Sequence, residues 1–282
     1  MNILHFEIIY NISLYYNMNL IDNDYYIIRR GDFATDGNTK ILYCILSIFL
    51  CIEEYITNKS TDCFSIMIGS TIIWTSIEFI LHLSNTRVIK QMSINWFGKK
   101  LYLPNYLGIF LQGFQEGGFI TTSGLYFGDR LFHFKYFIIL HILILFIILN
   151  IILKNNNTIS SKRKINTPGS LACIGGVSLY NIYYLYQNPY HFARQFTMFT
   201  SIVYISSIWT FVTWYKGFRS VEIYTKHDDK RSIENDISID NNTSIEACIK
   251  PISKIDTLLV LGYDVIFEIG VAYMFFYNLF IG

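Results

Sequence analysis

Residues 74–83 read WTSIEFILHL, a stretch in which an acid and a base interrupt an otherwise almost wholly apolar run. Glu78 and His82 are four positions apart, close to one helical turn, so on a helix their side chains share a face. The apolar run extends over residues 63–83, and a membrane span needs about 20 mostly apolar residues. The stretch therefore predicts a transmembrane helix that carries ionisable groups.

The composition of the whole chain indicates the same medium. The 282 residues are 52% hydrophobic and only 15% charged, whereas about a quarter of the residues in soluble proteins are charged. The formal net charge of +1 gives no reason to expect nucleic acid or another strongly charged partner. We expect the lipid bilayer as the partner and a lipid-like or small molecule as the candidate substrate.

The same length criterion, applied along the chain, predicts seven spans. They cover residues 40–57, 63–83, 104–128, 132–153, 169–187, 195–217 and 256–280. Residues 3–20 fit either an eighth span or an interfacial helix, so residues 1–37 are predicted as a separate N-terminal segment and 38–282 as one transmembrane domain. The predicted fold class is all-α: a polytopic bundle of transmembrane helices, integral to a membrane that the sequence does not identify.

The basic residues predict how the bundle is oriented. With seven spans, one face carries all but four of the 22 Lys and Arg residues, the four being Lys59, Arg130, Lys135 and Arg194. Because such residues gather on the cytoplasmic side, the connections 84–103, 154–168 and 218–255 are predicted to be cytoplasmic and the C-terminus non-cytoplasmic. The connection 218–255 is polar and mixed in charge, which is typical of a mobile loop.

Carboxylates occur inside three of the predicted spans, where ionisable groups are expensive and face a bundle interior by default. At about 1.5 Å per residue, Glu78 lies roughly 8 Å, Asp264 roughly 12 Å, and Glu116 and Glu268 roughly 18 Å from the cytoplasmic ends of their spans. His82 lies nearer the surface, where an interfacial role is favoured. The four carboxylates are thus predicted to share the inner half of the bilayer.

Several carboxylates that converge at low dielectric cannot all ionise without compensation. Three uses follow: acid–base chemistry on a lipid-like substrate, proton or cation coupling in a carrier, and a metal site that includes His82. The candidate catalytic residues are Glu78, Glu116, Asp264, Glu268 and His82. The Glu-x-x-His spacing of di-iron bundles is absent, and the sequence indicates no particular metal or cofactor.

A structural role is the alternative, because polar side chains also join membrane helices, at about 1 kcal/mol per hydrogen bond. The sequence contains no Walker loop, Rossmann glycine pattern or HExxH motif, and the last predicted span contains no lysine for a retinal Schiff base. A membrane-embedded enzyme, a carrier, and a structural or assembly component without catalytic activity therefore all remain open.

Glycines surround Glu116 in the third predicted span, at Gly113, Gly117 and Gly118. They fit two explanations equally well. Small residues let helices pack closely, and a broken helix with glycines can line a substrate or ion site.

Overall fold

The computed structural model describes residues 23–130, 134–154, 158–165, 167–225 and 250–282. The described chain is mostly helical. Its long helices are α2 (Gly37–Asn58), α3 (Asp62–Leu83), α4 (Asn105–Gly113) continued by α5 (Ile120–Gly128), α6 (Phe134–Ile147), α7 (Pro168–Gln187), α8 (Phe192–Tyr215), and α10 (Lys254–Tyr263) continued by α11 (Ala272–Phe280). Each of the seven predicted spans coincides with one of these helical segments.

Capping residues explain where several of these helices begin. The Asp36 carboxylate accepts a hydrogen bond from the Thr39 backbone N–H at 2.8 Å, at the start of α2. Thr167 caps α7 in the same way, with Pro168 in its first turn. Such caps satisfy backbone N–H groups that have no partner within the helix. The sequence therefore sets these starts locally.

Four of the helical segments are long and apolar enough to cross a membrane: Gly37–Asn58, Asp62–Leu83, Pro189–Tyr215 and Lys254–Phe280. The predicted bundle of seven spans is therefore not confirmed among the described residues. In the third predicted span, polar Gln112, Gln115 and Glu116 interrupt the apolar run. The predicted eighth span, residues 3–20, lies outside the described residues.

Large apolar side chains on these helices face outward. Ile45, Phe49 and Leu179 are 59%, 63% and 70% exposed, respectively, whereas a soluble monomer rarely exposes wide apolar patches. The interior holds Cys51, Ile66, Met198 and other buried side chains of α2, α3, α5, α8 and α11. An apolar outer surface is what contact with membrane lipid requires.

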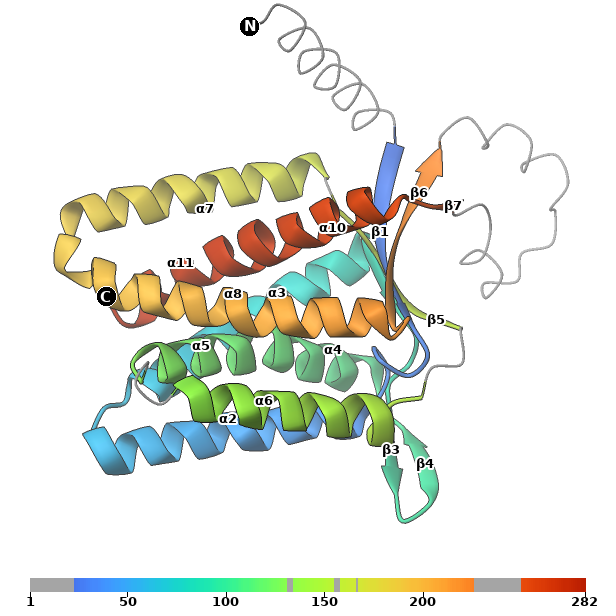
Figure 1. Ribbon diagram of the computed structural model, residues 1–282, viewed down its shortest axis with the longest axis horizontal. Helices are drawn as coiled ribbons and strands as arrows, with labels where there is room; N and C mark the ends of the chain where they lie inside the picture. Colours follow the sequence, from blue (N-terminus) through green and yellow to red (C-terminus); the bar gives the residue numbers. More distant parts are fainter. Residues whose placement is uncertain (1–22, 131–133, 155–157, 166, 226–249) are drawn as a thin grey trace, which may run out of the picture.

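Successive helices run in opposite directions, so the described strands lie at one end of the bundle and the C-terminus lies at the other (Figure 1). We call the first of these the sheet end. Its antiparallel sheet has the order β2-β5-β1-β6-β7, formed by Arg87–Ile89, Ile159–Lys164, Asn23–Arg30, Arg219–Thr225 and Lys250–Pro251. The bundle is thus not purely helical, and the all-α prediction is wrong in this respect.

The sheet is built from the segments that connect the helices. Residues 219–225 and 250–251 are strands and α10 begins at Lys254, so both ends of the predicted mobile loop 218–255 are ordered structure. The middle of that loop, 226–249, lies outside the described residues. Strand β1 falls within the predicted N-terminal segment 1–37. These strands were missed because they are short and pair with partners far away in the sequence.

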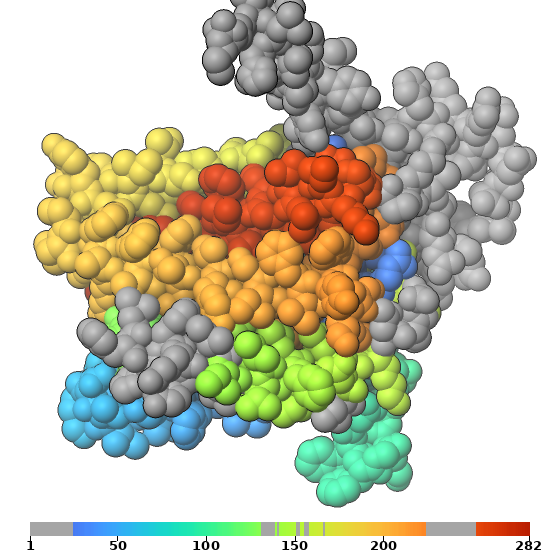
Figure 2. Space-filling model, in the orientation of Figure 1, coloured from blue at the N-terminus to red at the C-terminus, as the bar shows by residue number. Residues whose placement is uncertain are grey.

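A second, two-stranded hairpin consists of β3 (Ser93–Trp96) and β4 (Lys99–Tyr102). Figure 2 shows its turn projecting from the bundle at the sheet end, while β3 contacts the start of α2 through a hydrogen bond from Asn38 to the Asn95 carbonyl at 3.2 Å. Its turn residues Phe97 and Gly98 both have positive φ, 46° and 77°, as tight hairpin turns require.

The third predicted span is a continuous helix in which α4 and α5 are joined by a π-helical segment, η1 (Phe114–Phe119). Its glycines allow close packing on α3: a Cβ at Gly117 would lie 2.6 Å from the Ser70 carbonyl oxygen, and one at Gly113 would lie 2.6 Å from the Thr75 Cα. Close packing is therefore the explanation that the structure supports, and the helix is not broken.

Candidate functional site

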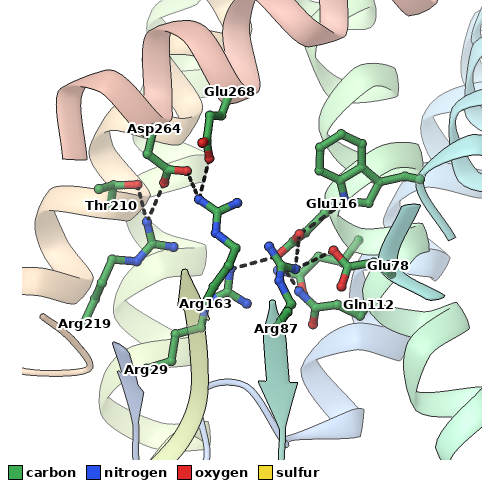
Figure 3. A network of polar contacts seen from close by, with 12 residues as sticks. Arg29, Glu78, Arg87, Gln112, Glu116, Arg163, Thr210, Arg219, Asp264 and Glu268 are labelled. Carbon is green, nitrogen blue, oxygen red and sulfur yellow. Dashed lines mark hydrogen bonds and ion pairs between the residues drawn. The ribbon is translucent and has the colours of Figure 1, made fainter. Parts of the chain in front are cut away.

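Four arginines project from one face of the sheet towards the bundle (Figure 3). Arg87 on β2 pairs directly with Arg163 on β5, and Arg29 on β1 pairs directly with Arg219 on β6. Residues opposite each other on antiparallel strands point to the same face. Like charges in such positions repel each other, so this face needs compensating anions.

Carboxylates on the helices supply part of that compensation. Arg87 Nη1 donates to Glu78 on α3 and, at 2.8 Å, to Glu116 Oε2 in η1. Arg29 donates to the other oxygen of Glu116 at 2.7 Å. Glu116 also accepts from Trp74 Nε1 at 3.2 Å and from the Gln112 amide. Its carboxylate is therefore the centre of one half of the network.

The other half lies on the last helix. Arg163 donates to Asp264 and, at 2.7 Å, to Glu268 Oε2. Arg219 donates to Thr210 Oγ1 at 2.9 Å and lies 3.5 Å from Asp264 Oδ2. Together the two halves join the sheet to helices α3 and α8 and to the two π-helical segments that carry Glu116, Asp264 and Glu268 (Figure 3).

Two of the three described π-helical segments carry these acids. Glu116 lies in η1, and Asp264 and Glu268 lie in η6 (Asp264–Val271), which joins α10 to α11. The third, η3 (Ile148–Ile152), follows α6 and carries no acid, and Glu78 lies on the regular α-helix α3. A π segment has a wider turn than an α-helix and is often found at functional sites.

The strand arginines differ in how far nearby carboxylates compensate their positive charges. Burial disfavours the charge of Arg87, but Glu116 and Glu78 outweigh this effect and raise its pKa. The same balance, with Glu268 and Asp264 as the acids, raises the pKa of Arg163. By contrast, burial and then the positive charge of Arg29 lower the pKa of Arg219 to about 10. Arg219 is thus the arginine whose charge is least compensated.

A cavity of about 150 Å³ opens beside this network. Its charged wall carries the cations Arg29, Lys40, Arg163 and Arg219 and the acids Glu116, Asp264 and Glu268. The rest of its wall is mainly apolar or aromatic and includes Leu46, Leu50, Ile144, Ile205 and Trp209 from α2, α6 and α8. Its other polar residues are Gln115, Ser123, His141, Ser206 and Thr210. The cavity is therefore charged at the sheet end and apolar farther along the bundle.

Two hydroxyl groups in the cavity wall have no hydrogen-bond partner among the residues that the structure describes: Ser123 Oγ on α5 and Ser206 Oγ on α8. Both side chains are buried. Buried polar atoms in proteins are nearly always paired with protein groups or ordered water, so these hydroxyls are available to a molecule in the cavity.

The structure brings the four predicted carboxylates into one region. Glu116, Asp264 and Glu268 line the same cavity, and Glu78 joins them through the Arg87 nitrogen that it shares with Glu116. The compensation that such converging carboxylates require comes from the strand arginines that pair with them. These arginines were among the residues counted only as cytoplasmic loop charges.

His82 is separate from this group. It lines a second pocket with Phe79, Leu83, Gln91 and Asn105. Among the residues that the structure describes, no group of three or more His, Cys, Asp or Glu side chains is arranged to hold a metal ion. The predicted combination of His82 with the carboxylates as metal ligands therefore has no counterpart in the described site.

No protein-family model matches this chain, and neither the curated proteins nor the solved structures provide a match. What can be stated of its class comes from the fold: four apolar helices of spanning length, which are compatible with a membrane protein.

Proposed function

We propose that this protein is a membrane-embedded enzyme or carrier that takes an amphipathic substrate into the cavity between the sheet and helices α2, α6 and α8. The observation that carries this proposal is the division of the cavity wall into a charged end and an apolar remainder. Ligand sites are typically apolar clefts with a few polar groups that fix orientation. A molecule with a polar headgroup and an apolar tail matches that division.

The length of the cavity fits a headgroup followed by a lipid-like tail. Lys40 in its charged wall and Leu50 in its apolar wall are ten residues apart on α2, or about 15 Å along the helix axis. The hydrocarbon core of a bilayer is about 30 Å thick. The cavity thus extends over the depth of about one leaflet, with its charged end at the level of the sheet.

Chemistry or coupling would fall to the acids of the cavity wall. Glu116, Asp264 and Glu268 lie beside guanidinium groups in a site largely removed from water. At the low dielectric of such a site, the charge of a proton or cation exchanged with the ligand interacts strongly with these acids. Glu78 has no place in the wall and is assigned a positioning role, because it holds Arg87 against Glu116. His82 is assigned no role in this site.

Filling the cavity tests the proposal. The full chain, reconstituted in nanodiscs of uncharged galactolipid that contain no phosphate, is heated with and without 12-carbon amphiphiles, and unfolding is followed by intrinsic fluorescence. We expect at least one amphiphile to raise the unfolding temperature of the wild type but not of Ser206→Phe, whose ring occupies the cavity. Ser76→Phe, at an exposed serine of α3, is the matched control. An equal response of all three proteins, or none, contradicts ligand binding in this cavity.

Two assays then distinguish an enzyme from a carrier. An enzyme alters a bound amphiphile chemically, whereas a carrier moves it unchanged between the leaflets of proteoliposomes. Either activity should be lost in Ser206→Phe and retained in Ser76→Phe.

A structural or assembly role is the second candidate, favoured by the pairing of all four acids with strand arginines. In that case Glu116→Gln changes stability but leaves amphiphile binding and any activity untouched.

A further inference from the structure

The cavity wall holds more positive than negative groups. Among the described lining residues, four are cations (Arg29, Lys40, Arg163 and Arg219) and three are carboxylates (Glu116, Asp264 and Glu268). The remaining pair nearby, Arg87 with Glu78, is self-compensating. An excess charge inside a bundle is costly unless a counter-ion meets it, so the question is where that counter-ion would sit.

Lys40 lies on one side of the position where a counter-ion would bind. Lys40 is 3% exposed, and its ammonium donates to Gln115 Oε1, the oxygen of a neutral amide. The positive charge of Arg29 and the negative charges of Glu116 and Asp36 all act on that ammonium. Among the described residues Lys40 forms no direct ion pair with a carboxylate, so its ammonium is available to an anionic ligand.

Arg219 lies on the other side of this counter-ion position. It is 5% exposed, its Nε has no hydrogen-bond partner, and its nearest carboxylate oxygen is at 3.5 Å. It stands directly opposite Arg29 across strands β1 and β6. The lowered pKa of Arg219, caused by burial and then by Arg29, agrees with this crowding of positive charge.

We infer that the ligand of this cavity carries a phosphate headgroup, bound by Arg29, Lys40 and Arg219, with its apolar tail directed along α2, α6 and α8. This inference rests on the proposed function. The three cations come from β1, α2 and β6, and the oxygens of a phosphate group point in tetrahedral directions and can meet cations from several sides, whereas the two oxygens of a carboxylate lie in one plane. Guanidinium groups bind phosphate with pairs of parallel hydrogen bonds. The ligand anion supplies the charge that the protein's own carboxylates lack.

The nanodisc assay tests the headgroup directly, with four probes: dodecyl phosphate, dodecanoate, dodecyltrimethylammonium and inorganic phosphate. We expect dodecyl phosphate to stabilise the wild type at concentrations at least tenfold lower than any other probe. Equal potency of dodecanoate overturns the assignment of phosphate, and equal potency of dodecyltrimethylammonium overturns an acidic headgroup altogether. Inorganic phosphate acting as well as dodecyl phosphate shows that the site takes free phosphate and that the tail contributes nothing.

Two lysines, one buried in the cavity wall and one exposed, provide the test variant and its control. Lys40→Met should weaken dodecyl phosphate at least tenfold, while Lys40→Arg should retain binding. Lys99→Met, at an exposed lysine of the β3–β4 hairpin, is the matched control and should behave as the wild type. If Lys40→Met does not fold, Arg219→Gln provides the same comparison. Unchanged dodecyl phosphate binding in these variants refutes the inference.

The same assay distinguishes a failure of amphiphile binding from a failure of phosphate recognition. If every 12-carbon probe stabilises the wild type equally and Ser206→Phe abolishes the effect, the cavity binds amphiphiles but the headgroup is not phosphate. If no amphiphile acts on the wild type, the proposed function itself fails.

Discussion

Arg87 Nη1 lies 2.8 Å from Glu116 Oε2, and the same nitrogen also donates to Glu78. One guanidinium from a three-residue strand thus joins two helices, while being 1% exposed itself. The two carboxylates thus share one buried cation, and Glu116 also binds Arg29 at 2.7 Å.

Removal of that cation should be strongly destabilising. We expect Arg87→Met to lower the free energy of unfolding by about 3–5 kcal/mol, because breaking a buried ion pair leaves a buried charge without a partner. Arg194→Met is the control: Arg194 pairs with Asp62 and Asp129 but is one-third exposed, and exposed pairs contribute about 1 kcal/mol or less. Chemical unfolding in detergent micelles measures both. Similar losses in the two variants would contradict the central role of Arg87.

Packing around η1 should tolerate no added methyl group. A Cβ at Gly117 would meet the Ser70 carbonyl oxygen at 2.6 Å, a backbone atom that cannot rotate away. We expect Gly117→Ala to cost about 1–3 kcal/mol, as overpacking does. Gly175→Ala, on α7 with nothing within 4 Å of the new Cβ, should be neutral or stabilise by up to about 1 kcal/mol. Thermal unfolding of the two variants compares them, and a stable Gly117→Ala would show that α3 and η1 are not closely packed.

Two buried threonines on α8 should differ in importance. Thr210 Oγ1 accepts a hydrogen bond from Arg219 at 2.9 Å, whereas Thr213 Oγ1 donates only to backbone carbonyls of its own helix, on Trp209 and Thr210. We expect Thr210→Val to cost about 1–3 kcal/mol, since it removes the partner of a buried charged donor. Thr213→Val should cost less, because those carbonyls already belong to the helix. The order of the two losses in urea unfolding is the test.

The alternation of the helices predicts which positions face the same side of the membrane. Single cysteines at Lys99 and Lys216, at the sheet end, should be shielded from an impermeant maleimide applied from the non-cytoplasmic side. Cysteines at Lys59 and Gly282, at the other end, should react. Each variant is made in a background without the native cysteines. Equal labelling of Lys216→Cys and Gly282→Cys in intact cells would refute the proposed orientation.

Much of the helical framework could be predicted because each helix is recognisable from its own local sequence. A continuous apolar run such as 63–83 needs no knowledge of distant residues, and the described helices begin and end within a few residues of the predicted bounds. The charge alternation added the direction of each helix. What local runs could not establish is how many of these helices cross the bilayer.

The sheet could not be predicted in the same way. Strand β2 has three residues and β5, ISSKRK, is almost wholly polar, so neither displays an apolar alternation. Their pairing joins segments separated by more than 70 residues in the sequence. Only the folded bundle brings these connections to one end.

The acids of the site were predictable and their partners were not. Glu78, Glu116, Asp264 and Glu268 stand out because they interrupt apolar runs. Arg29, Arg87, Arg163 and Arg219 resemble ordinary basic residues that flank membrane helices, a pattern that charge placement alone explains. A signal was present in their position next to β-branched or aromatic residues, as in TRVIK and YYIIRR, but it is weak without the partner strands.

The central place of β1 in the sheet has a consequence for how the chain is made. Arg29 accepts a contact from Ser160, 131 positions later in the sequence, and Arg30 pairs with Glu222, 192 positions later. At roughly 5–20 residues per second, β1 leaves the ribosome about 10–40 s before β6 exists to pair with it. For that interval the first strand lacks its β6 partner, and Glu116 is likewise made before Arg219. The finished network therefore cannot guide the folding of the early helices; it can only stabilise them once the last strands have been synthesised.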